Sequence, residues 1–146
     1  MLLTKTSLAF IACAAFAAGI IAHAIFAPVA TVHAAGNRVF EMRTYTAAPG
    51  KLDALNARFR DHTLKLFEKH GMKNIGYWVP QDAPLKDNTI IYVLAHESRE
   101  AAAKSWKAFG ADPDWVKAKG DSEKDGRLAV KADSVFLDPT DYSPVK

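Results

Sequence analysis

Residues 38–46 alternate in polarity along their length, and this alternation constrains the fold more than any other feature of the chain. Phe40 and Met42 are apolar and occupy even positions. The odd positions carry charged or aromatic side chains: Glu41, Arg43 and Tyr45. Successive side chains of a strand point to opposite faces, so the pattern predicts a β-strand with one apolar face and one polar face. We expect helices to cover the apolar face. The polar face must then meet water, a partner or a ligand.

The beginning of the chain has the organisation of a secretory signal peptide. Lys5 supplies a positive charge, an apolar run extends over residues 7–27, and Val32-His33-Ala34 places small residues where a signal peptidase cleaves. We therefore predict a signal peptide at residues 1–34, cleaved after Ala34, and export to the periplasm or out of the cell. The alternative is an uncleaved anchor, because the apolar run approaches the roughly 20 residues that span a bilayer. Only that alternative predicts contact with a membrane.

Cleavage leaves residues 35–146, which are enough for one small domain. The sole cysteine, Cys13, lies in the leader, so the mature chain has no disulfide framework. All 16 acidic residues and every basic residue except Lys5 lie in the mature part, which gives it a net charge of +2. These charges are interleaved and form no basic stripe. We therefore exclude nucleic acid as a partner.

The periodicity of the mature chain predicts the order β-α-β-β-α-β. Four segments have strand character: residues 38–46, 73–80, 89–96 and 127–137. The helical segments are residues 51–70, with Gly71 as the stop signal, a helix that begins after Ser98 and stops at Gly110, and a short helix that Asp112-Pro113 opens and that runs to about Lys119. In the first helix an apolar stripe runs through Leu52, Leu55, Phe59, His62, Leu66 and Phe67. The order is that of an α+β, ferredoxin-like unit, with one antiparallel sheet and both helices on one face.

Four motifs, in this order along the chain, carry a family resemblance. They are Glu41-Met42-Arg43-Thr44-Tyr45-Thr46 with Pro49-Gly50-Lys51, then Phe67-Glu68-Lys69-His70-Gly71, Gly76-Tyr77-Trp78 and Ala111-Asp112-Pro113-Asp114-Trp115. Over about residues 39–137 the sequence resembles NIPSNAP domains. The resemblance implies a dimeric α/β barrel, in which two sheets pack face to face and enclose a cavity. Relatives of that fold group include antibiotic-type monooxygenases, haem-degrading enzymes and small isomerases. NIPSNAP proteins have no settled reaction, so the resemblance names no substrate.

The polar strand face supplies the candidate ligand-binding residues. In segment 89–96 we expect Ile91 and Val93 on the helix side, so that Tyr92 and His96 join the polar face of the first strand. The candidate set is therefore Glu41, Arg43, Tyr45, Tyr92 and His96. Arg43 would bind an acidic group of the ligand and Glu41 would orient that arginine. The alternative is a structural Glu–Arg pair inside a dimer interface, with His96 exposed at a strand end.

The histidine spacing does not indicate a metal site. His62 and His70 are eight residues apart, which is not the four-residue spacing of a helical metal site. Without a cysteine or a dense His/Asp cluster in the mature chain, we predict no metal and no cofactor. His62 is either a core histidine or a ligand, and His70 would interact with the helix C-terminus. We expect Trp106 and Trp115 to be core anchors.

Three hypotheses for function follow. The first is an exported homodimer that binds a small ligand in the cavity between the two sheets. The second is a cofactor-independent monooxygenase or isomerase that acts on a small aromatic or enolisable substrate. In that reaction His96 would move a proton and Arg43 would stabilise an enolate-like charge. The third is a structural or partner-binding dimer without a ligand, in which Glu41 and Arg43 only stabilise the interface.

Overall fold

The computed structural model describes residues 38–146. The predicted signal peptide at residues 1–34, its cleavage after Ala34 and the alternative of an uncleaved anchor all lie outside the described residues. Within residues 38–146, no helix has both the length and the apolar character that a bilayer crossing requires.

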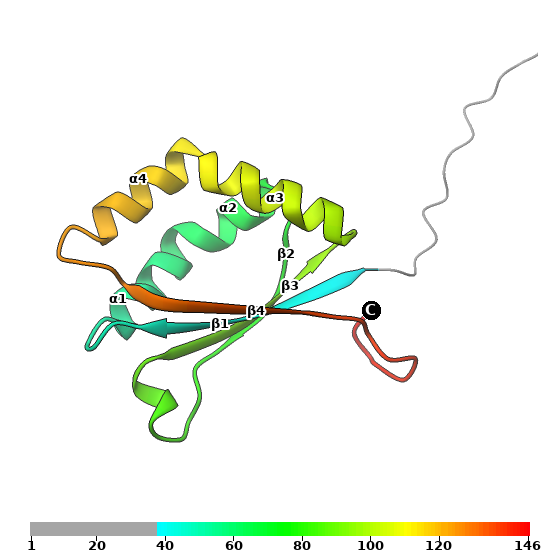
Figure 1. The fold of residues 1–146 in the computed structure, drawn as a ribbon, viewed down its shortest axis with the longest axis horizontal. Helices are drawn as coiled ribbons and strands as arrows, with labels where there is room; N and C mark the ends of the chain where they lie inside the picture. Colours follow the sequence, from blue (N-terminus) through cyan, green and yellow to red (C-terminus); the bar gives the residue numbers. More distant parts are fainter. Residues whose placement is uncertain (1–37) are drawn as a thin grey trace, which may run out of the picture. The chain divides into compact units, whose positions relative to one another are not determined.

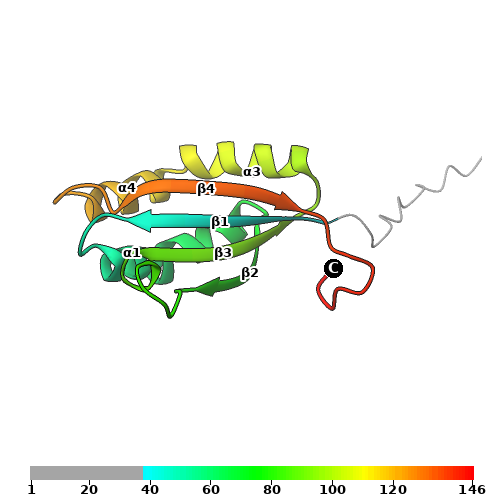
Figure 2. The same cartoon turned by 60° about the horizontal axis from the view of Figure 1, so that its bottom comes forward.

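The described part of the chain forms a four-stranded sheet. Its strands are β1 (Val39–Ala47), β2 (Lys73–Trp78), β3 (Thr89–His96) and β4 (Ala129–Leu137). The strand order is β2-β3-β1-β4, and every neighbouring pair is antiparallel (Figure 2). The sequence predicted all four strands, each within two residues at either end. The long polar loop between β2 and β3 also contains a short 3-10 helix, η2 (Leu85–Asp87).

Helices cover one side of this sheet. The first helical segment consists of α1 (Leu52–Arg58), a π-helical turn η1 (Phe59–Thr63) and α2 (Leu64–Lys69), and the second consists of α3 (Arg99–Ala111) and α4 (Pro113–Ser122). The η2 loop and the C-terminal tail lie on the opposite side of the sheet (Figure 1). This arrangement confirms the α+β, ferredoxin-like fold.

Local sequence signals set the ends of these helices. The Ser98 hydroxyl accepts a hydrogen bond from the Ala101 N–H and caps α3, and the Asp112 carboxylate accepts one from the Asp114 N–H and caps α4. Gly71 follows the last turn of α2 with a φ of 77°, a conformation that glycine adopts without steric cost. These three residues were predicted as start and stop signals, and the prediction is confirmed.

The hydrophobic core lies between the sheet and the helices. Tyr92, Leu94 and Ile90 of β3 face Leu55, Phe59, Leu66 and Phe67 of the first helical segment, and Phe109 of α3 joins them. Tyr77 of β2 packs against the same core, while the neighbouring Trp78 is 54% exposed on the other face. The largest side chains of β3 therefore point toward the helices.

The helices cover the face of the sheet that the sequence predicted to be open. Glu41, Arg43 and Tyr45 lie on the helix side, where Trp106 of α3 contacts both charged residues. Phe40 and Met42 lie on the open side. The prediction that helices cover Phe40 and Met42 is therefore wrong. The period-two pattern separates two faces but does not say which one is covered, and α3 supplies a donor that makes burial of Glu41 possible.

The same reversal applies to β3. Its register pairs Arg43 with Tyr92, so the two share a face, and Ile91 and Val93 point to the open side. The prediction that Ile91 and Val93 face the helices is wrong, although the prediction that Tyr92 and His96 share a face with Arg43 is confirmed. The open face of the sheet carries mostly apolar side chains: Phe40, Met42, Ile91, Val93, Ala95, Trp78, Val135 and Leu137.

The π-helical turn η1 changes which residues of the first helix are buried. An α-helix would place His62 in the apolar stripe, but η1 adds a residue to the turn, and the Leu64 N–H donates to the Phe59 carbonyl five residues earlier. Thr63 is consequently buried, and its hydroxyl donates to the Arg58 carbonyl at 3.1 Å. His62 is exposed. The prediction of His62 in the core stripe is wrong for this reason.

Candidate functional site

Glu41 is the centre of a polar cluster on the helix side of the sheet. The residue is 1% exposed, yet its carboxylate accepts three side-chain hydrogen bonds. Arg43 Nη1 donates to Oε1 at 3.0 Å, Trp106 Nε1 donates to Oε2 at 2.6 Å, and His96 Nε2 lies 3.0 Å from the same Oε2. A buried carboxylate is tolerated only when it is paired and hydrogen-bonded, and these three partners meet that requirement.

The partners of Glu41 keep it ionised. Burial alone would raise the pKa of the Glu41 carboxyl, because a low dielectric disfavours the charged form. The hydrogen bonds from His96 and Trp106 and the charge of Arg43 outweigh burial and hold the pKa below its usual 4.5. The carboxylate is therefore a permanent anion at neutral pH. It offsets the charge of Arg43 and fixes the orientation of that guanidinium.

Arg43 is held on three sides but is not fully covered. Its guanidinium carbon lies 4.2 Å from the centre of the Trp106 ring and 5.6 Å from that of Tyr45. Its Nε is buried and has no hydrogen-bond partner within residues 38–146. The side chain is nevertheless 18% exposed. A guanidinium has five N–H donors in a planar fork, so Arg43 retains donors for an acceptor outside the cluster.

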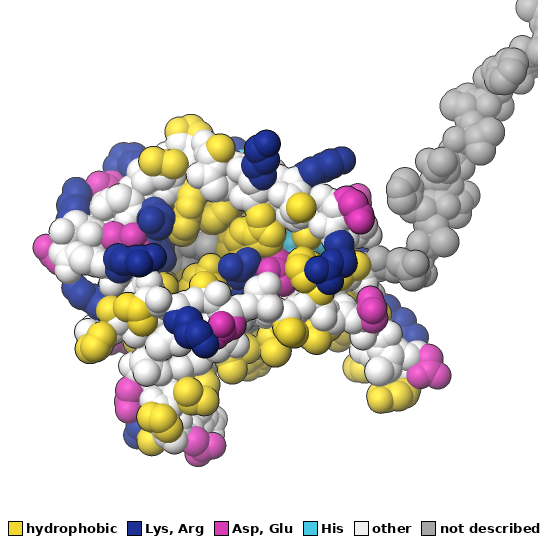
Figure 3. Space-filling view, viewed as in Figure 1, with side chains coloured by type: hydrophobic (Ala, Val, Ile, Leu, Met, Phe, Trp, Pro, Cys, Tyr) yellow, Lys and Arg dark blue, Asp and Glu magenta, His cyan; other side chains and the backbone are white. Residues whose placement is uncertain are grey.

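A cleft gives access to Arg43 at the β4 edge of the sheet. On the helix side of β4, Ser134 stands beside Arg43 and Ala132 stands beside Tyr45, and both small residues are exposed. The space-filling view shows this side of the molecule hollowed between the helices and the sheet, with hydrophobic, basic, acidic and histidine side chains gathered there (Figure 3). The helices therefore leave part of the polar strand face uncovered.

Tyr92 and Tyr45 form the aromatic floor behind this cluster. Their rings meet edge to face at 5.4 Å between centroids, and Tyr92 is fully buried. Burial and the nearby Tyr45 raise the pKa of the Tyr92 hydroxyl well above its usual value. Tyr92 is therefore neutral at physiological pH and can act only as a hydrogen-bond group, not as a base.

His96 forms a carboxylate–imidazole pair with Glu41. The histidine is 2% exposed, and its Nδ1 is buried without a hydrogen-bond partner in the described part of the chain. Its ring lies 6.3 Å from that of Phe136, and the Arg99 guanidinium covers the Phe136 ring at 4.1 Å. The expectation that His96 could be an exposed residue at the strand end is wrong, because α3 and β4 enclose it.

The structure thus brings all five candidate residues together, but not in the expected place. Glu41, Arg43, Tyr45, Tyr92 and His96 share the face of the sheet that packs against the helices, so they cannot line a cavity between two sheets. Trp106 belongs to the same cluster, although the sequence suggested only a core anchor. A buried indole needs a partner for its N–H, and that requirement is the signal that could have linked Trp106 to a buried acid.

Within residues 38–146, His62 and His70 take part in no comparable site. His70 Nε2 lies 2.6 Å from Asp112 Oδ2, and Lys69 Nζ contacts the same oxygen at 2.8 Å. These contacts join the end of α2 to the start of α4 and lower the pKa of Asp112. Among the residues that the structure describes, no group of three His, Cys, Asp or Glu side chains is arranged to hold a metal ion.

The fold and the buried polar cluster define a ferredoxin-like α+β domain with a cleft between its sheet and its helices. The sequence model of the NIPSNAP family matches residues 40–144, which is more than half of the chain. The protein belongs to the NIPSNAP family. No curated protein matches the sequence.

Solved structures show the same fold. A NIPSNAP family protein of unknown function from Agrobacterium tumefaciens is 24% identical with a TM-score of 0.66, and the match covers 78% of this chain and 98% of that one. A NIPSNAP-like domain protein from Burkholderia xenovorans is 21% identical with a TM-score of 0.64, over 73% and 89% of the two chains. SnoaB, a cofactor-independent oxygenase from Streptomyces nogalater, is 11% identical over 75% and 98% of the two chains, with a TM-score of 0.48.

Proposed function

We propose that this NIPSNAP domain binds a small ligand in the cleft between its sheet and its helices, with Arg43 as the polar anchor. The proposal rests on the fixed orientation and the partial exposure of the Arg43 side chain. Glu41 and Trp106 fix its guanidinium at 3.0 Å and 4.2 Å, yet the side chain remains partly exposed toward a cleft. Such pre-organisation lowers the entropic cost of binding.

The surroundings of Arg43 define the class of ligand. Glu41 already balances the charge of the guanidinium, so the ligand needs an acceptor oxygen rather than a full negative charge. A carbonyl or a carboxylate meets this need, and a carboxylate can accept two parallel N–H bonds from an arginine. Tyr45, Trp106 and Ala132 offer an aromatic and aliphatic surface to the rest of the molecule. We therefore infer a small, mainly apolar ligand that carries a carbonyl or carboxylate group.

Retention of a co-purified ligand tests this proposal. Native mass spectrometry of the protein purified from its own host should detect a small bound molecule. Arg43→Ala should lose it, while Arg127→Ala, which changes an exposed arginine elsewhere, should keep it. Arg43→Lys keeps the charge beside Glu41 and serves if the alanine variant is unstable. Equal retention by wild type and both Arg43 variants would contradict the assignment.

We also propose that the protein is a homodimer formed through the open face of the sheet. That face is mostly apolar and includes Trp78, Val135 and Leu137, which are 54%, 47% and 40% exposed. Contiguous exposed apolar surface is uncommon in monomers and is typical of interfaces. Two sheets packed through this face would leave the Arg43 cleft of each copy free on the outside.

Oligomeric state in solution tests the dimer. Analytical ultracentrifugation of the exported protein should give twice the mass of the chain. Val135→Lys places a charge on the open face along the edge strand β4 and should shift the equilibrium toward monomer. Val116→Lys, on the exposed side of α4, is the matched control and should not change the mass. A monomeric wild type at micromolar concentration would refute the proposal.

Export remains a proposal that rests on the leader sequence. We propose that the mature protein begins at Ala35 and resides in the periplasm or outside the cell. Mass spectrometry of the N-terminal peptide from fractionated cells should find Ala35 as the first residue. An intact Met1 in a membrane fraction would support the uncleaved anchor instead.

One observation favours an enzymatic role as a second candidate. The Glu41 carboxylate orients the His96 imidazole, and this pairing is common where a histidine transfers protons. The reaction would be a cofactor-independent oxygenation or isomerisation of a substrate that forms an enolate, with Arg43 beside the developing charge. Turnover of quinols or enolisable ketones should fall at least tenfold in His96→Ala. Unchanged turnover in that variant would remove His96 from the mechanism.

A further inference from the structure

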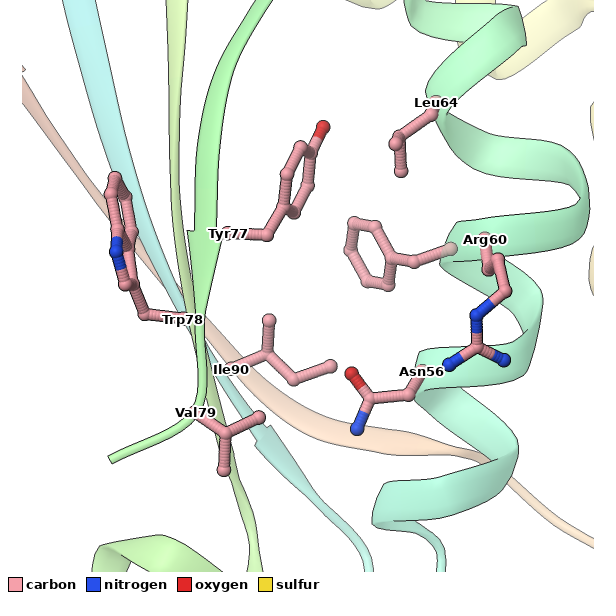
Figure 4. A pocket seen from close by; sticks show the side chains of 8 residues that line it. Asn56, Arg60, Leu64, Tyr77, Trp78, Val79 and Ile90 are labelled. Carbon is pink, nitrogen blue, oxygen red and sulfur yellow. The ribbon is translucent and has the colours of Figure 1, made fainter. Parts of the chain in front are cut away.

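A second pocket lies at the opposite edge of the sheet from the Arg43 cleft. It has a volume of about 260 Å³ and lies between the first helical segment and strands β2 and β3. Its lining residues are Asn56, Phe59, Arg60, Leu64, Tyr77, Trp78, Val79 and Ile90. In the close-up, Tyr77, Leu64, Ile90 and Asn56 point into the space between strand and helix, whereas Trp78 points away from it (Figure 4).

An aromatic layer separates this pocket from the Arg43 cleft. The Tyr77 ring stacks on Tyr92 with 5.3 Å between centroids, and Phe59 meets Tyr92 edge to face at 5.1 Å. Tyr92 is fully buried between the two sites. The pocket is therefore a site of its own, and a ligand in the Arg43 cleft does not explain it.

The π-helical turn makes the inner wall of this pocket apolar. Its hydrogen bond joins Leu64 to Phe59, so these two apolar side chains lie one above the other on the pocket wall. In an unbroken α-helix, Phe59 would instead pair with Thr63, which would bring a hydroxyl toward the same space. The turn directs Thr63 to the Arg58 carbonyl. π-helical turns within α-helices are frequently associated with functional sites, and here the turn has a direct effect on the pocket.

The outer end of the pocket is polar and cationic. Arg60 and Asn56 lie there, on the same side of the helical segment (Figure 4). Arg60 forms no ion pair within residues 38–146, although lysine and arginine side chains form eight ion pairs elsewhere in this part of the chain. The Asn56 amide forms no side-chain hydrogen bond in the same range. The inner end differs, because the Tyr77 hydroxyl already donates to Asn74 at 2.5 Å.

From this geometry we propose that the pocket binds a small organic acid, with an aromatic or branched aliphatic body inside and a carboxylate on Arg60 and Asn56. The volume suits one ring with a short substituent, since ligand pockets for larger molecules are about 300 Å³ or more. The apolar wall of Phe59, Leu64 and Ile90 accepts the body. The guanidinium of Arg60 and the amide of Asn56 supply donors for the carboxylate.

Titration with phenylacetate, followed by amide NMR shifts, tests this proposal. Saturable shifts should appear at Asn56, Arg60, Leu64 and Tyr77. Arg60→Gln should raise the dissociation constant of phenylacetate by about fivefold. That is the largest effect expected from loss of one exposed ion pair. Lys65→Gln removes another exposed cation of the same helix, outside this pocket, and should leave the constant unchanged. Phenylacetamide, which lacks the charge, should bind wild type and Arg60→Gln equally.

A variant that fills the pocket gives an independent check. Leu64→Phe adds volume at the wall and should abolish the shifts for both probes while the thermal transition of the protein stays cooperative. Equal phenylacetate affinity in Arg60→Gln and Lys65→Gln would overturn the proposal. Shifts confined to Arg43, Ala132 and Ser134 would also overturn it, and would at the same time support the separate cleft at the other edge of the sheet.

Discussion

The stability of this domain should depend strongly on the carboxylate of Glu41, and Glu41→Gln tests this dependence without leaving a cavity. Glutamine has the shape of glutamate but replaces one acceptor oxygen by an NH₂ group. That group cannot accept from Arg43, His96 or Trp106, so at least one buried donor loses its partner. The change also leaves Arg43 without its counter-ion.

The magnitude follows from these contacts. A hydrogen bond to a charged group contributes about 1.5–3 kcal/mol, and an unsatisfied buried donor costs about 1–3 kcal/mol. Arg43 is partly exposed and can regain water, which reduces the cost of its lost counter-ion. We therefore expect Glu41→Gln to reduce the free energy of unfolding by about 3 kcal/mol. For a domain of this size that corresponds to a fall in Tm of about 12 °C.

Thermal and urea unfolding, followed by circular dichroism at pH 7, measure this effect. Glu97→Gln is the matched control, because Glu97 follows His96 directly but is exposed, and it should change stability by less than about 0.5 kcal/mol. A melting temperature of Glu41→Gln within about 2 °C of wild type would mean that the carboxylate does not stabilise the domain. In that case the three donors would have other partners, and the carboxylate would not organise the cluster.

Three further predictions concern pH, backbone conformation and capping. The pKa of Glu41 in the folded state lies below its usual 4.5, so its contribution to the free energy of unfolding is complete above pH 4.5 and is lost as the pH falls through the folded pKa. The free energy of unfolding should therefore fall more steeply with decreasing pH for wild type than for Glu41→Gln. Parallel plots of stability against pH would contradict this. Gly71→Ala should lower the free energy of unfolding in urea by about 1 kcal/mol, because Gly71 has a φ of 77°. Gly110→Ala within α3 should leave that free energy unchanged or raise it. Equal effects of the two substitutions would show that the positive φ of Gly71 does not matter. Ser98→Ala removes the cap of α3 and should lower the free energy of unfolding in urea by about 1 kcal/mol. Unchanged stability would show that the hydrogen bond between Ser98 and Ala101 contributes nothing.

The fold could be predicted from the sequence because its local signals agree with one another. Alternation marks the strands, Ser98 and Asp112 mark helix starts, and Gly71 marks a helix end. Each signal acts over a few residues and depends on backbone geometry alone. The family motifs point to the same fold, so local and global information are consistent.

The face of the sheet that the helices cover could not be predicted from these patterns. Phe40 and Met42 are apolar, and burying them under the helices is the simplest reading of a two-sided strand. The actual choice depends on a contact across 65 residues, in which Trp106 donates to Glu41. Burial of the charged face becomes acceptable only once that donor, His96 and Arg43 are in place.

The exposure of His62 shows a similar limit. Its position in the apolar stripe follows from a period of 3.6 residues, and the single widened turn η1 displaces it. No residue between Phe59 and Thr63 is a proline or glycine that would signal an irregular turn. The candidate site residues could be grouped correctly, because strand register keeps Arg43 and Tyr92 together whichever face is covered.

The most direct test of the binding proposal is a crystal structure of the protein purified from its native host. We expect electron density for a small molecule between β4 and α3, with an oxygen atom within hydrogen-bond distance of the Arg43 guanidinium. The Glu41 carboxylate should remain bonded to Trp106 and His96. A cleft closed by protein side chains, with every donor of Arg43 bonded to residues of its own chain, would contradict the binding proposal.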